Sequence, residues 1–159
     1  MKKLFLLSIT LLGFTFASSA QNIADNALGL RLGDSDGLGA EITYQRALGD
    51  NNRIEADLGW RNGNDYSAFK LAGLYQWVWN IDGGFNWYAG AGAGLASYSG
   101  RNDNNLDDDF GFFAAGDVGI EYDFDIPLLI SLDFRPEIGN NRFTDNTLFD
   151  IALSLRYQF

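Results

Sequence analysis

Apolar and polar residues alternate with a period of two along most of the chain beyond residue 26. The clearest run is residues 147–159. One parity there is apolar or aromatic (Phe149, Ile151, Leu153, Leu155, Tyr157 and Phe159), and the other includes Asp150, Ser154, Arg156 and Gln158. A helix would scatter these two sets around its surface, whereas a strand places each set on its own face. The segment is therefore predicted to be a β-strand.

Seven earlier segments alternate in the same way and are also predicted to be strands: 27–33, 38–48, 53–61, 66–79, 85–98, 110–124 and 128–138. The connections alternate in character. One set consists of three short connections: 49–52, 80–84 and 125–127. The other set consists of 34–37, 62–65, 99–109 and 139–146, and it includes the longest connections and most of the loop charge. Such links suffice for consecutive antiparallel strands. Eight strands joined in order predict an up-and-down meander that closes into a barrel.

A soluble barrel of the lipocalin type and a membrane barrel share this pattern but differ in which face is apolar. The polar face is rich in small residues: Gly29, Gly59, Ala72, Gly90, Gly92, Gly94, Gly111, Ala115, Gly119 and Ala152. A surface facing water would carry more Lys and Glu, whereas the interior of an eight-stranded barrel is narrow. Aromatic residues also gather beside the short connections, where an interfacial girdle belongs. The fold class predicted is all-β: an eight-stranded antiparallel up-and-down transmembrane β-barrel.

The first twenty residues have the three parts of a secretory signal peptide. Lys2 and Lys3 are followed by an apolar stretch over residues 4–16 and by the small residues 17–20. An N-terminal membrane anchor is the alternative, but the apolar stretch is short for a span and no charged stop-transfer segment follows it. We expect residues 1–20 to be a cleaved signal peptide and residues 21–159 to form the barrel domain.

The C-terminal strand carries a more specific resemblance. Its alternating apolar residues Leu153, Leu155, Tyr157 and Phe159 resemble the terminal signal of Gram-negative outer-membrane barrels. The mature chain as a whole resembles the small eight-stranded family, the outer-membrane-protein-X-like and A-like transmembrane domains. That resemblance implies an integral outer-membrane protein of porin-like type. It also implies delivery by periplasmic chaperones and insertion by the barrel-assembly machinery, which reads the terminal strand.

Charged residues of the polar parity are expected to face the barrel interior. They are Arg31, Glu41, Arg53, Glu55, Asp57, Lys70, Asp117, Glu121, Asp133, Arg135, Glu137, Asp150 and Arg156, together with Asp123. Paired carboxylates can perform acid–base chemistry. Buried charges must nevertheless find partners or be neutralised, so a salt-bridged plug is the preferred interpretation of this lumen charge network.

Composition narrows the function classes. The chain carries 11 Lys or Arg residues and 21 Asp or Glu residues, for a formal charge of −10, and this argues against a nucleic-acid partner. It has no Cys and no His, so neither a thiolate nor an imidazole can serve as nucleophile, general base or metal ligand. No catalytic residue, metal site or cofactor is predicted. Residues 34–37 and 102–109 offer oxygen ligands for calcium, but neither matches an EF-hand loop, and solvated loops are favoured.

The function predicted is therefore non-enzymatic: a structural and surface-interacting protein of the envelope, expected to be a monomer. A narrow ion-conducting pore is the alternative, and a lipid-modifying barrel enzyme is disfavoured by the missing His. Arg61, Arg101 and Arg142 lie in or beside connections assigned to the extracellular side. They are predicted to contact lipopolysaccharide phosphates, although pairing with loop carboxylates is an equal alternative.

Overall fold

The computed structural model describes residues 23–33, 39–62, 66–102, 105–139 and 148–159, and every secondary-structure element in it is a β-strand. The eight strands are β1 (Asn26–Gly33), β2 (Gly39–Ala47), β3 (Asn52–Asn62), β4 (Tyr66–Asp82), β5 (Phe85–Asn102), β6 (Asn105–Asp123), β7 (Leu128–Gly139) and β8 (Leu148–Gln158). No helix among these residues is long and apolar enough to cross a membrane. The signal peptide predicted for residues 1–20 lies outside the described part of the chain.

All eight predicted strands are present, and three of them extend at one end by three or more residues beyond the prediction. β4 continues to Asp82, β5 to Asn102, and β6 already begins at Asn105. The prediction of a loop over residues 99–109 is therefore wrong. Ser99 pairs with Asp108 and Arg101 with Leu106, so the hairpin extends well past the apolar alternation. Leu106 is the only large apolar residue between 99 and 109, so no period-two apolar pattern marks the strands there.

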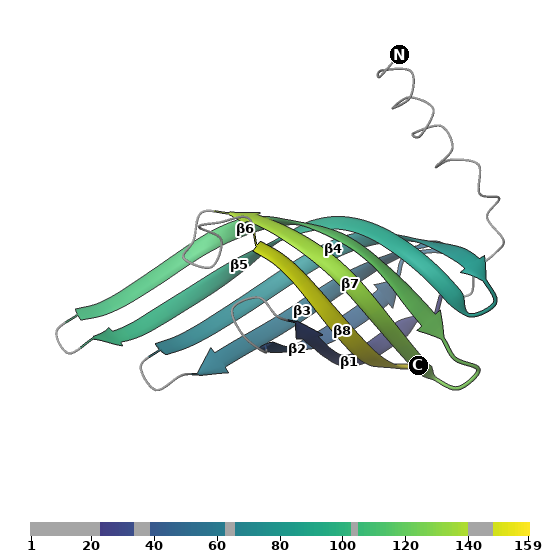
Figure 1. Cartoon of the computed structure of the whole chain (residues 1–159), viewed down its shortest axis with the longest axis horizontal. Helices are drawn as coiled ribbons and strands as arrows, with labels where there is room; N and C mark the ends of the chain where they lie inside the picture. Colours follow the sequence, from purple (N-terminus) through teal and green to yellow (C-terminus); the bar gives the residue numbers. More distant parts are fainter. Residues whose placement is uncertain (1–22, 34–38, 63–65, 103–104, 140–147) are drawn as a thin grey trace, which may run out of the picture.

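The strands pair in chain order, and β1 closes the barrel by pairing with β8 (Figure 1). The register shows how far the strands are staggered. One row of paired residues runs from Ala27 through Gln45, Glu55, Leu74, Gly92, Ala115 and Glu137 to Leu148. Across the closing seam, however, Ala27 pairs with Gln158. The offset of ten residues between Leu148 and Gln158 is the shear of the barrel, and it requires the strands to tilt by about 40°.

The two ends of the barrel differ. The short turns after β2, β4 and β6 lie at the end where Phe159 ends the chain, which we call the turn end (Figure 1). The long β3–β4 and β5–β6 hairpins project at the opposite end, the hairpin end (Figure 1). Backbone hydrogen bonds complete the turn end: the N–H of Asn26 donates to the carbonyl oxygen of Phe159 (3.1 Å) and that of Phe159 to Asn26 (2.9 Å).

The apolar residues face outward and the polar residues face inward. On β8, for example, Ile151, Leu153 and Leu155 are each more than half exposed, whereas Ala152, Ser154 and Arg156 are buried. The same alternation holds along β1, β3 and β7. This outside-apolar arrangement suits a lipid-facing surface and is the reverse of a lipocalin-type barrel. The predicted transmembrane form of the barrel is therefore confirmed at the level of fold.

Two rings of aromatic side chains border the apolar surface. The inner girdle, at the turn end, comprises Trp77, Trp79, Phe85, Trp87, Tyr122, Phe124, Tyr157 and Phe159; the outer girdle, toward the hairpin end, comprises Trp60, Phe69, Phe110 and Phe112. Ring contacts join parts of each girdle: Trp79 and Trp87 stack (4.4 Å between centroids), and Phe110 meets Phe112 edge to face (5.2 Å). The two girdles lie eight to twelve residues apart along β4 and β6. With a rise of about 3.3 Å per residue and the tilt above, that is roughly 20–30 Å, which brackets the apolar band of outer-membrane barrels.

Small inward-facing residues make room for the few large rings inside. A Cβ at Gly94 would meet the ring of Phe113, and a Cβ at Gly119 would meet the ring of Tyr88. Phe113 packs with Ala72, Leu74, Ala96 and Ala115 in a small apolar cluster inside the barrel. Gly94 therefore makes room for Phe113, whereas at Gly90 and Gly92 an added Cβ would meet the neighbouring strand β4, chiefly its backbone.

Candidate functional site: a closed, ion-paired lumen

Arg135 on β7 lies at the centre of the lumen charge network. It is completely buried, and its guanidinium donates to Asp57 Oδ2 (2.7 Å) and Glu55 Oε1 (2.7 Å) on β3, across the barrel. Glu55 Oε2 also accepts from Arg156 on β8 (3.0 Å) and from Gln45 on β2 (2.6 Å). These bonds span the lumen from wall to wall, because the barrel is narrow enough for side chains from opposite strands to meet.

Arg31 on β1 forms a second centre. Its side chain is fully buried and contacts three carboxylates: Asp133 (2.6 Å), Asp150 (2.7 Å) and Glu41 (3.0 Å). Toward the hairpin end, the Lys70 ammonium pairs with Glu137 (2.6 Å), lies 3.9 Å from Glu41, and stands over the ring of Phe113. Lys70 is the most accessible member of the network, with a fifth of its side chain exposed.

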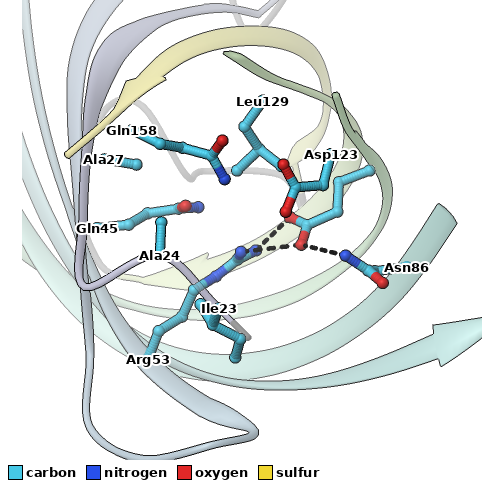
Figure 2. Close-up of a pocket in the computed structure, with 10 residues that line it drawn as sticks. Ile23, Ala24, Ala27, Gln45, Arg53, Asn86, Asp123, Leu129 and Gln158 are labelled. Atoms are coloured by element: carbon cyan, nitrogen blue, oxygen red, sulfur yellow. Dashed lines mark hydrogen bonds and ion pairs between the residues drawn. The ribbon is translucent and has the colours of Figure 1, made fainter. Parts of the chain in front are cut away.

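Arg53 organises the turn end of the lumen. It pairs with Glu121 (2.8 Å), donates to Gln76 (2.6 Å) and stacks over the ring of Tyr88. Figure 2 shows Arg53 and Asn86 reaching the same carboxylate from opposite sides, beside a cavity of about 10 Å³. This volume is near the minimum for a single water molecule. Asp123 and Gln158 line the same cavity, which Ile23 and Ala24 border near the start of the described chain.

The structure thus brings together all thirteen charged residues proposed for the network, while Asp123 lies half-buried at its edge. Eight carboxylates share five bases. Four carboxylate oxygens accept no hydrogen bond within the described part of the protein: Asp57 Oδ1, Asp117 Oδ1, Asp133 Oδ2 and Glu121 Oε2, the last of which is ion-paired with Arg53 (2.8 Å). The acidic excess makes the lumen more hospitable to cations than to anions.

Several neutral partners in the network were not predicted as site residues. Thr43 and Ser131 accept hydrogen bonds from Arg156, and Gln76 bridges Arg53 to Asp117. All three share the inward parity of their strands, so the period-two alternation could have identified them. A search for charged residues alone misses them. They are needed because a buried guanidinium has five N–H donors, more than its carboxylate partners satisfy.

The remaining predicted sites fall elsewhere. Leu153, Leu155, Tyr157 and Phe159 lie on the outward face of the closing strand and are each more than half exposed. Arg61 lies at the outer end of β3 and Arg101 at the outer end of β5, but neither side chain belongs to the described part of the structure, and Arg142 lies outside the described residues altogether. The same limit applies to the possible calcium loops at 34–37 and 102–109. Among the described residues, no group of three or more His, Cys, Asp or Glu is placed to hold a metal ion.

No protein-family model matches the chain, and no curated protein sequence is significantly similar to it. Solved structures are similar. The N-terminal β-barrel domain of Pseudomonas aeruginosa OprF superposes with a TM-score of 0.70 at 13% identity, covering 89% of this chain and all of that domain. Neisserial surface protein A superposes with a TM-score of 0.61 at 14% identity, covering 84% of this chain and 94% of that one.

The attachment invasion locus protein Ail of Yersinia pestis has a TM-score of 0.60 at 13% identity, with 84% of this chain and 96% of Ail covered. At these identities the similarity is one of fold. The chain has the fold of the small eight-stranded outer-membrane barrels, and the resemblance inferred from its sequence is confirmed at that level.

Proposed function

We propose that this protein is a monomeric, integral outer-membrane barrel, exported through cleavage of residues 1–20, with a non-enzymatic structural and surface-interacting role in the envelope. The observation that carries the proposal is the lumen, which buried side chains fill from wall to wall. A barrel whose lumen is filled with side chains has little room for a solute to pass, so we expect its interactions to be made by the surfaces that face lipid and water. The apolar band supports the outer-membrane location, as do solved neighbours that include a surface protein and an attachment protein.

The hairpin end is proposed to face the exterior, with the turn end and the C-terminus in the periplasm. In this orientation Arg61 and Arg101 lie at the outer ends of β3 and β5, and Arg142 follows β7. Guanidinium groups bind phosphate through paired hydrogen bonds. The other partners proposed are membrane lipid and, during biogenesis, the periplasmic chaperones and the barrel-assembly machinery.

Substituting Arg61, Arg101 and Arg142 together by Gln is expected to reduce the thermal stabilisation that lipopolysaccharide confers on the refolded barrel. Three weak surface contacts of this kind correspond to a loss of about 2–6 °C. The measurement is the unfolding midpoint with and without lipopolysaccharide in the same micelles, with the midpoint in micelles alone as the control. A triple variant that gains as much as the parent would disprove the contact.

A narrow ion pore is the second candidate function, favoured by the acidic excess of the lumen and by the partly accessible Lys70 at its mouth. We expect the parent to show no steady single-channel openings in planar bilayers, because Arg135 and Arg31 bridge the lumen through buried ion pairs. Steady, cation-selective openings would instead establish the pore and contradict the closed-barrel interpretation.

A further inference from the structure

Three polar side chains interrupt the inner girdle. Asn26, Arg46 and Asn52 occupy outward-facing positions on the neighbouring strands β1, β2 and β3. Asn26 pairs with Arg46, which pairs on its other side with Ile54; Asn52 lies two residues from Ile54, diagonal to Arg46, and pairs with Trp77 of the girdle on β4. On the other side, the backbone of Asn26 bonds to Phe159. The polar gap therefore sits level with the girdle, between its β4 and C-terminal aromatics.

Arg46 is the single base outside the lumen among the described side chains. It is exposed, and within the described part of the protein its guanidinium has neither an ion-pair nor a hydrogen-bond partner. A cation on the lipid-facing surface is costly at the midplane and tolerated near the interface, where headgroup phosphates can reach it. The planar guanidinium suits a phosphodiester because it presents two parallel N–H donors.

The neighbours of Arg46 shape the gap. Tyr44 donates its hydroxyl to Asn26 Oδ1 (2.7 Å), and Asn26 Nδ2 donates to the carbonyl oxygen of Phe159 (3.4 Å), so the Asn26 amide is held in place. The side chain of Asn52, diagonal to Arg46 on β3, is half-buried and offers a further amide donor. A fixed amide thus lies opposite the unpaired Arg46, and an available amide lies diagonal to it.

Two exposed acidic residues lie beyond Arg46, on the water side of the gap at the turn end. Asp25 is exposed, and its carbonyl oxygen accepts the N–H of Ala47, next to Arg46 (3.0 Å). Asp50, in the β2–β3 turn, is also exposed. A ligand whose phosphate binds Arg46 would direct its next group toward these acids. An anionic group there is disfavoured by charge, whereas a primary ammonium is attracted and can donate three hydrogen bonds.

We propose that the Arg46 gap binds one phospholipid of the leaflet at the turn end, with its phosphate on Arg46 and Asn52 and a primary amine, two carbons away, beside Asp25 and Asp50. The occupant is an ethanolamine-type zwitterionic headgroup. This inference rests on the proposed insertion in a bilayer, and it concerns the leaflet opposite to the lipopolysaccharide contacts.

The test uses the refolded full-length mature barrel and native mass spectrometry to count bound lipid. Phosphatidylethanolamine and phosphatidylglycerol with identical acyl chains are titrated separately, and inorganic phosphate is added as a competitor. The parent is expected to retain one phosphatidylethanolamine and to bind phosphatidylglycerol more weakly. Arg46→Gln should weaken ethanolamine-lipid binding about tenfold, the loss expected when a charge-assisted pair is removed. Arg46→Lys, which keeps the charge without the planar fork, should lie in between.

Ile126→Gln is the control, because it introduces the same amide at an exposed position between β6 and β7, outside the gap, and should leave this binding unchanged. Equal binding by the parent and Arg46→Gln would overturn the site. Preference for phosphatidylglycerol would overturn the amine assignment, and displacement by inorganic phosphate would reduce the site to an anion site without lipid specificity. Heat-modifiable migration in gels checks folding separately, so a failure of barrel formation is distinguishable from a failure to bind lipid.

Discussion

Replacing Arg135 by Met is expected to lower the free energy of unfolding of the refolded barrel by about 3–5 kcal/mol. The guanidinium is fully buried and supplies hydrogen bonds to Glu55 and Asp57. Methionine fills much of the same space but leaves Asp57 without this donor in a site that water does not reach. Losing one member of a buried ion pair is costly because the remaining charge is neither paired nor hydrated.

Urea unfolding in micelles, followed by tryptophan fluorescence and by gel migration, measures the effect. Arg46→Met is the matched control: it removes the same group from the outer surface and should change the unfolding free energy by no more than about 0.5 kcal/mol. Adding Asp57→Asn to Arg135→Met removes the stranded carboxylate, so the double variant should recover part of the loss. An Arg135→Met barrel as stable as the parent would show that the lumen network does not hold the walls together.

Deleting Phe159 is expected to lower the amount of protein in the outer membrane several-fold and to increase its degradation in the periplasm. The resemblance of the terminal strand to the assembly signal of outer-membrane barrels leads to this expectation. The structure adds a second contribution, because the N–H and carbonyl of Phe159 both bond to Asn26 at the closing seam. The exposed ring also stands beside Tyr157, 6.4 Å between centroids.

Two comparisons separate these contributions. Phe124→Ala removes another exposed aromatic of the inner girdle without touching the C-terminus, so it should leave assembly closer to normal. Refolding the deletion variant into micelles tests the seam alone, since no assembly machinery is present. Normal outer-membrane levels of the deletion variant in cells would rule out the signal.

Much of the architecture follows from the sequence alone. A strand places alternate residues on opposite faces, so the parity of Leu153, Leu155 and Tyr157 against Ser154 and Arg156 determines both the strand and its two sides. The abundance of Gly and Ala on the polar side determines which side is enclosed, because a narrow lumen cannot hold large residues everywhere. The same parity assigns the charged residues to the interior before any contact is known.

The partners of those charges were decided only by the tertiary structure. Arg135 meets Glu55 and Asp57 at sequence separations of 80 and 78 residues, and the shear of the closed barrel determines which inward residues share a level. The alternation of apolar and polar residues does not determine the register between neighbouring strands, because shifting a strand by two residues leaves the same residues facing inward. The length of the β5–β6 hairpin was equally hidden, because Leu106 is the only large apolar residue between 99 and 109 and no period-two alternation marks the strands there. The polar gap at Arg46 emerges only when β1, β2 and β3 lie side by side, which brings Asn26 opposite Arg46 and places Asn52 diagonally from it, two residues from its direct partner Ile54.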